Sequence, residues 1–153
     1  MATTYKADNY SDPMPSLPDP LAHKRVFKFT LGAAFVIEDI VSLCPLQALS
    51  GLVLLDYYID VPDLDTGATP TITLDLGFDG TNEEDDLVDG STVGQAAGKI
   101  SMDGDGVAGA MPKTLTTDKV LQLHVDAAPQ TGATTGTIKG WLEYLFYSRA
   151  ITL

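Results

Sequence analysis

Regular alternation of apolar and polar residues is the main pattern in this chain, and it predicts β-strands. Four segments alternate in this way: residues 24–31, 71–78, 119–125 and 137–147. In the first of them Phe27, Phe29 and Leu31 share one face. A period of two places successive side chains on opposite faces of a sheet, so each segment is expected to bury one face.

Two further apolar runs lack a strict period. Residues 34–43 fit a strand or a helix, although their Val and Ile residues favour a strand, and Pro45 is expected to end it. Residues 52–60 are apolar on both faces in their first half, as in the middle of a sandwich or at a subunit contact. Pro62 is expected to stop that strand.

Two polar segments centred on Thr-Gly-Ala-Thr, residues 65–70 and 130–135, precede well-patterned strands. Glycine allows the positive φ that tight turns need, and Thr and Ile favour the strands beside it. The pattern predicts a β-hairpin at each.

Residues 79–113 form a long stretch of glycine, acidic and small residues with little period. We expect one helical turn over residues 83–88, capped by Thr81 or Asn82, and a short strand over residues 99–102. Long loops in compact domains are often binding loops, so this stretch is a candidate contact region by location alone.

The N-terminal residues differ from the rest of the chain. Prolines recur at Pro13, Pro15, Pro18 and Pro20. Because proline lacks an N–H and favours extended backbone, residues 1–23 are predicted to be an extended arm, either a disordered tail or a strap against a neighbouring subunit. Residues 24–153 are predicted to be one all-β domain, an antiparallel β-sandwich or jelly-roll-like fold with at most one short helix.

The last predicted strand carries apolar side chains on the face that should be polar. Trp141, Leu145 and Tyr147 share that face. They would form an aromatic contact surface, or else belong to a central strand covered on both sides within the monomer. Together with the four arm prolines, they are our candidate subunit-contact residues.

Charge narrows the possible partners. The formal net charge is -12, and no Lys or Arg occurs between Gly32 and Gly98. Nucleic-acid binding depends on Lys and Arg, so DNA or RNA is not expected as a direct partner. The simpler interpretation is that the acids only keep a β-rich surface soluble and discourage edge-to-edge pairing.

Compartment signals are few. The N-terminus lacks the apolar core of a signal peptide, and the longest apolar stretch, residues 52–55, is too short to span a bilayer, so we expect no membrane association. Cys44 is the single cysteine and lies in an apolar run, which predicts a buried hydrophobic residue and fits synthesis in a reducing cytoplasm.

Motifs for chemistry are weak. Asp65-Thr66-Gly67 matches the aspartic-protease triplet, but the second copy that the mechanism needs is absent and a turn explains these residues. His23 and His124 lack companion ligands, and His124 is expected at the surface. We therefore predict no catalytic residue, no cofactor and no enzymatic activity.

Two acidic segments have the start of a calcium loop. They begin at Asp63 and Asp103, but the twelfth positions, Leu74 and Thr114, lack the required glutamate. We assign no metal residue, while a looser calcium site between chains stays open.

The order of the segments resembles that of small β-rich structural proteins of tailed bacteriophages, found on virions as capsid decoration or cement proteins. The resemblance runs from about residue 24 to 147 and rests on these segments: residues 24–31, 32–40, 58–69, 72–77 and 127–137. It implies a protein made in the host cytoplasm that binds the major capsid protein on the outer capsid surface. It also implies a homo-oligomer, with a trimer favoured.

Two alternatives remain open from the sequence. One is a neck or tail component of the virion, and the other is a calcium-dependent adhesion or carbohydrate-binding β-sandwich.

Overall fold

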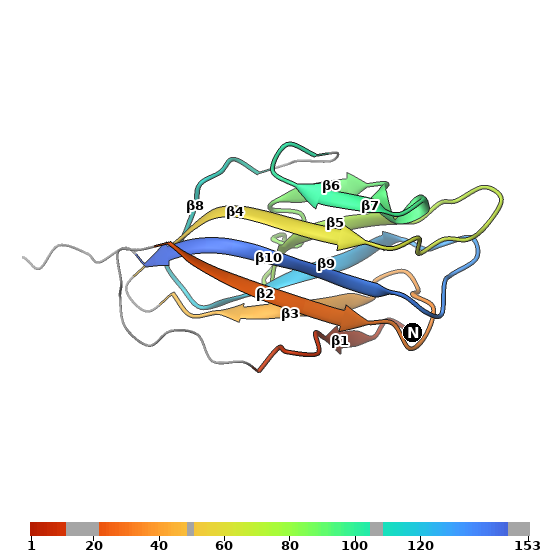
Figure 1. Cartoon of the computed structure of the whole chain (residues 1–153), viewed down its shortest axis with the longest axis horizontal. Coiled ribbons are helices and arrows are strands. Elements are labelled where there is room, and N and C mark those ends of the chain that lie inside the picture. The colour runs from red at the N-terminus through yellow and green to blue at the C-terminus, as the bar shows by residue number, and fades with distance from the viewer. Residues whose placement is uncertain (12–21, 49–50, 105–108, 147–153) are drawn as a thin grey trace, which may run out of the picture.

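The protein is a β-sandwich, as its alternating pattern predicts (Figure 1). The structure is a computed structural model that describes residues 1–11, 22–48, 51–104 and 109–146. Within these ranges, two five-stranded sheets pack face to face and the one helical element is a short 3₁₀ turn. The predicted all-β class is therefore confirmed.

The first sheet, here named the β9 sheet, has the order β1-β3-β9-β5-β6. Its strands are β1 (Thr4–Lys6), β3 (Ile40–Leu46), β9 (Lys119–Ala127), β5 (Thr73–Phe78) and β6 (Val88–Ser91). Neighbours run antiparallel except β1 and β3, which are parallel.

The second sheet, the β10 sheet, has the order β2-β10-β4-β7. Its strands are β2 (His23–Thr30), β10 (Thr137–Phe146), β4 (Leu52–Val61) and β7 (Gly98–Ser101), and β8 (Lys113–Leu115) pairs with the first part of β4. Figure 1 shows β2, β10 and β4 side by side in front of the β9 sheet.

The core lies between the two sheets and is filled by the inward positions of every long strand. Tyr57 and Tyr144 are its largest fully buried side chains. Leu121, Leu123 and Val125 face them from β9 and are at most 1% exposed. Each such side chain contributes about 1.5–3 kcal/mol through burial, so the alternation in the sequence is what holds the sheets together.

The two Thr-Gly-Ala-Thr segments do not form hairpins. The first joins β4 to β5 and the second joins β9 to β10, so each carries the chain from one sheet to the other. Thr66 and Thr131 pair through their backbones, with Thr66 N donating to Thr131 O at 2.9 Å. The hairpin prediction is wrong because local turn chemistry does not specify which strands pair.

Pro45 does not end the strand that contains it. It lies within β3, where it pairs with Val120 of β9. On the other side, β1 pairs only with Ile40–Ser42, so the part of β3 that holds Pro45 is an edge. A residue without an N–H is tolerated there because no ladder bond is lost.

Residues 84–87 form a turn and a bend, and β6 begins at Val88, so the helical turn predicted over residues 83–88 is wrong. Phe78 N donates to Glu83 O at 2.7 Å and Leu87 N donates to Leu76 O at 2.9 Å. These bonds hold the segment against β5, which satisfies its backbone without a helix.

The remaining part of this long stretch is also structured. It contains the 3₁₀ turn η1 (Val93–Gln95) and β7, which confirms the strand predicted over residues 99–102. Among the described residues, no helix has the length and apolarity needed to cross a bilayer.

The first eleven residues pack against the sandwich. Tyr5 of β1 contacts the rings of Phe29 and Phe35, with centroids 5.6 and 5.8 Å away. Asp8 N donates to Lys28 O at 2.6 Å, so the chain then follows the free edge of β2. The four arm prolines lie outside the described residues.

Candidate contact surface on the β10 sheet

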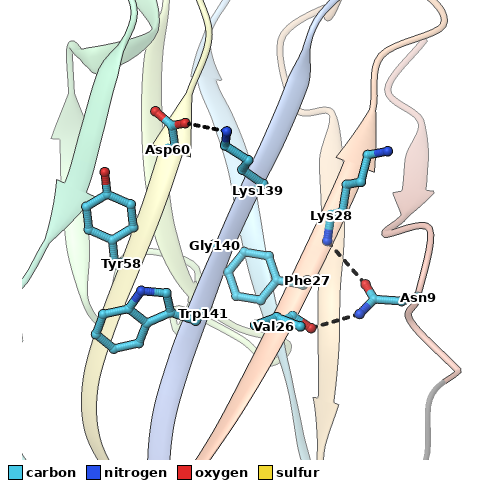
Figure 2. Close-up of a pocket in the computed structure, with 9 residues that line it drawn as sticks. All are labelled: Asn9, Val26, Phe27, Lys28, Tyr58, Asp60, Lys139, Gly140 and Trp141. Carbon is cyan, nitrogen blue, oxygen red and sulfur yellow. Dashed lines mark hydrogen bonds and ion pairs between the residues drawn. The ribbon is translucent and has the colours of Figure 1, made fainter.

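An apolar row crosses the outer face of the β10 sheet. Trp141 of β10 lies opposite Val26 of β2 on one side and Tyr58 of β4 on the other. The rings of Tyr58 and Trp141 stack, with centroids 6.1 Å apart and planes at 13° (Figure 2). Val26 is 62% exposed, so the row presents apolar surface to its surroundings.

The row faces outward because the other side of β10 fills the core. Leu142, Tyr144 and Phe146 are buried, whereas Trp141 and Leu145 alternate with them and are half-buried. The facing predicted from the sequence is therefore correct for these residues. Tyr147, the third member of the predicted patch, lies outside the described residues.

A groove of about 520 Å³ lies along this row. Gly140 forms part of its lining, and a Cβ there would lie 2.9 Å from the Phe27 ring and 2.2 Å from the Tyr58 carbonyl oxygen. The absent side chain therefore lets β10 approach its neighbours closely. Figure 2 shows Phe27 beside Gly140, and Phe27 belongs to the buried face of β2 whereas Val26 is on its exposed face.

Lysines border the row. Lys24 Nζ lies 3.7 Å from the centre of the Trp141 ring, a cation–π contact, and 3.8 Å from Glu143 Oε2. Lys139 Nζ lies 3.3 Å from Asp60 Oδ2. Lys28 lies opposite Lys139 and is exposed. The border therefore holds three lysines against two carboxylates, although the chain as a whole is strongly acidic.

Asn9 closes the groove at the edge of β2. Its Nδ2 donates to Val26 O at 2.8 Å, and Lys28 N donates to its Oδ1 at 3.2 Å (Figure 2). The amide side chain thus replaces the neighbouring strand that β2 lacks on this side, which blocks pairing of that edge with another chain.

Asp65, in the triplet that resembles a protease motif, joins the two loops that connect the sheets. Its carboxylate accepts hydrogen bonds from five backbone N–H groups, those of Gly67, Thr71, Ile72, Gln130 and Thr131. The residue is 1% exposed. A carboxylate engaged in this way is a structural acceptor, because its lone pairs are already used.

The protonation of Asp65 follows from these contacts. Burial alone would raise the pKa of the carboxyl group, but the hydrogen bonds from Thr131, Thr71, Gln130 and Gly67 outweigh it and hold the pKa well below its ordinary value. The sequence predicted a turn here but not the contact with the second loop, since nothing local indicates that the two segments meet.

His124 is not the surface residue that the sequence predicted. Its side chain is 12% exposed and lies between two carboxylates, with Glu38 Oε2 3.5 Å from Nε2 and Asp75 Oδ2 3.6 Å from Nδ1. Burial raises the pKa of the Asp75 carboxyl group, although the hydrogen bond that Gly90 N donates acts in the opposite direction.

Cys44 is buried as expected, and burial raises the pKa of its thiol to about 12. In the described part of the chain, no group of three or more His, Cys, Asp or Glu side chains is placed to hold a metal ion.

Comparison with solved structures finds similar chains in phage capsids. A chain in the solved capsid of Ralstonia phage GP4 is 30% identical, with a TM-score of 0.74 over 95% of this chain and 99% of that one. No protein-family model and no curated protein sequence matches the chain.

Two further solved structures share the fold. A chain in the capsid asymmetric unit of cyanophage Pam1 is 20% identical, with a TM-score of 0.63 over 90% of this chain and 96% of that one. A chain in the acid-stable capsid of Helicobacter pylori bacteriophage KHP30 is 16% identical, with a TM-score of 0.53 over 84% of this chain and 95% of that one. By its identity to the first of these three chains, the protein belongs to a family of bacteriophage capsid structural proteins.

Proposed function

We propose that this capsid protein is a decoration or cement protein, which binds the outer surface of the assembled shell and stabilises it. The observation that carries the outer position is charge. A protein with a net charge of -12 is repelled by packaged nucleic acid, so its charge favours a position on the outside of the shell.

The mechanism is linkage between binding and assembly. A partner that binds only the assembled state stabilises it by RT ln(1 + [L]/Kd), or about 2.7 kcal/mol per site when the free protein exceeds its Kd a hundredfold. The partner in this proposal is the major capsid protein. A closed homo-oligomer, with a trimer favoured, would bind several capsid subunits at once.

Capsids that lack the protein provide the direct test. Purified protein added to such capsids should sediment with them and should raise the temperature or pressure at which they release DNA. A protein that stays in the supernatant, or that binds without changing shell stability, contradicts the cement role. Immunogold labelling confined to the neck or tail would favour the alternative position in the virion.

Calcium separates this role from that of a calcium-dependent adhesion module. We expect CaCl₂ and NaCl at equal ionic strength to change Tm by similar, small amounts, because without a specific site both salts act only by screening the acidic side chains. A saturable rise in Tm with calcium, reversed by chelator, would instead indicate a specific site.

A further inference from the structure

We propose that the groove over Val26, Tyr58 and Trp141 binds the proline-rich segment 12–21 of a neighbouring copy of this chain. The inference goes beyond shell binding and does not depend on it, since copies could be linked in this way whether or not the capsid is their main partner.

The groove has the chemistry of a polyproline site. Its floor is an aromatic pair, Tyr58 stacked on Trp141, continued by the exposed side chain of Val26. Proline-rich segments bind to such aromatic grooves because their extended backbone is preformed and loses little entropy on binding. Tyr and Trp in addition supply large, rigid contact surfaces.

The chain itself contains a matching ligand. Segment 12–21 reads Asp-Pro-Met-Pro-Ser-Leu-Pro-Asp-Pro-Leu, with four prolines and three large apolar side chains in ten residues. No other part of the sequence has this density of proline.

Charge also matches between the groove and the segment. Asp12 and Asp19 are the charged residues of the segment, and neither Lys nor Arg occurs in it. Lys28 and Lys139 line the groove and Lys24 lies above the Trp141 ring. Asp60 pairs with Lys139 and Glu143 with Lys24, so the three lysines exceed the carboxylates beside them by one charge. The lysine-bordered groove is therefore suited to an acidic apolar ligand, whereas most of the remaining chain is too acidic to attract one.

The position of the anchors favours a neighbouring copy over the same copy. Both ends of the segment are fixed beside β2, because Arg25 Nη2 donates to Tyr10 O at 3.4 Å and Ala22 directly precedes the strand. Asn9 stands at the β2 end of the groove. Because Arg25 also donates to Pro45 O of the other sheet, Tyr10 lies at the edge of β2. A segment of the same copy would have to turn around this edge to reach the outer face, whereas a segment from a second copy can approach the outer face directly.

The first experiment uses Trp141, the sole tryptophan of the chain, as a fluorescent reporter. A synthetic peptide of residues 10–22 is titrated into full-length protein whose four arm prolines are changed to serine, so that its own segment does not compete. We expect a saturable change in Trp141 emission with a Kd of tens to hundreds of micromolar. A peptide with the same four Pro→Ser changes should bind at least tenfold more weakly.

A matched pair of valines provides the control. Val26→Ser, in the groove, should weaken peptide binding at least fivefold, whereas Val36→Ser, at an exposed valine in the β2–β3 loop, should leave it unchanged. Circular dichroism and Tm of both variants check that each is folded. Equal binding by the two variants, or no binding at all, overturns the proposed site.

The second experiment distinguishes the neighbouring copy from the same copy. Trp141→Ala protein, which keeps the prolines, is mixed with the Pro→Ser protein, which keeps Trp141. Docking between copies predicts a change in Trp141 emission on mixing and a heavier species in sedimentation velocity. Peptide binding without any effect of mixing would place the segment in its own groove and overturn the contact between copies.

Discussion

At the scale of single residues, Asp65 joins two distant parts of the chain. It satisfies N–H groups from both loops that pass between the sheets, so one carboxylate holds together segments that are 65 positions apart. Asp65 is also the first residue of the Asp-Thr-Gly triplet. Because its carboxylate is buried and bonded to backbone N–H groups, the structure explains the residue without a catalytic role. Loss of the Asp65 charge should therefore lower the free energy of unfolding.

Asp65→Asn should lower Tm by more than about 5 °C, since the amide presents a donor to backbone donors and leaves buried N–H groups unpaired. Asp89→Asn is the control, because it removes the same charge from an exposed position. Thermal melts of both variants at neutral pH check this. Similar Tm values for the two variants would contradict the role of Asp65.

Acid should weaken the wild-type protein through the same group. The folded pKa of Asp65 lies below its unfolded value, so its contribution is fully present above about pH 4 and is lost as pH falls toward the folded pKa. Melting curves between pH 5 and pH 2 should therefore fall more steeply for wild type than for Asp65→Asn. Parallel curves for wild type and Asp65→Asn would contradict this role of Asp65.

Cys44 should be inert in the folded protein. With a pKa of about 12 and 1% exposure, its thiolate is scarce and inaccessible at pH 8. A thiol reagent such as DTNB should react at least a hundredfold more slowly with native than with urea-unfolded protein. Rapid labelling of the native protein would show that this part of the core opens readily.

At the scale of elements, the sequence predicts strands well and their partners poorly. Alternation identifies β2, β9 and β10, because burial of one face imposes a period of two on each strand. Pairing across the sheet depends on residues far apart in the chain. The hairpin prediction failed for that reason, and so did the helical turn over residues 83–88, whose backbone bonds to β5 instead.

The candidate contact surface was also predicted only in part, because its residues come from different strands. Alternation alone assigned Trp141 and Leu145 to the strand face opposite Leu142 and Tyr144, and that facing is correct. Val26 and Tyr58 were missed, because only the register of β10 against β2 and β4 brings them beside Trp141. A search for aromatic residues at outward positions of the predicted strands could have found Tyr58.

A substitution at Gly77 tests whether residues 83–87 are held in place by β5. A Cβ at this position would lie 2.0 Å from Glu83 O, so Gly77→Ala should displace the segment and cost about 1–3 kcal/mol of unfolding free energy. Gly32→Ala is the matched control, since no heavy atom lies within 4 Å of its Cβ. Urea denaturation monitored by circular dichroism measures both. An equal effect of the two changes would show that residues 83–87 do not depend on β5.

At the scale of the whole molecule, charge opposes compactness. Lys113 pairs with Asp86 at 2.6 Å and Lys119 with Glu83 at 2.5 Å, and the side-chain hydrogen bond to Glu83 raises the pKa of Lys119. These half-exposed pairs contribute little individually. The formal charge of -12 remains, and its self-repulsion should dominate the response to salt.

Raising NaCl from 10 to 300 mM should therefore raise Tm by a few degrees, because screening weakens the repulsion more than it weakens the surface ion pairs. Differential scanning calorimetry at fixed pH measures the shift. A fall in Tm with salt would mean that the ion pairs outweigh the repulsion.

The attachment of residues 8–10 along β2 has a consequence for how copies could be spaced on a shell. Ten residues separate Ser11 from Ala22, and an extended chain covers at most about 3.6 Å per residue. Because both ends return to the same strand, the segment extends no farther than roughly 20 Å from its own chain. If the segment joins neighbouring grooves, this length limits the spacing between copies. If the spacing between copies on the shell exceeded this limit, the segment of one copy could no longer reach the groove of the next, although the fold of both copies would be unchanged.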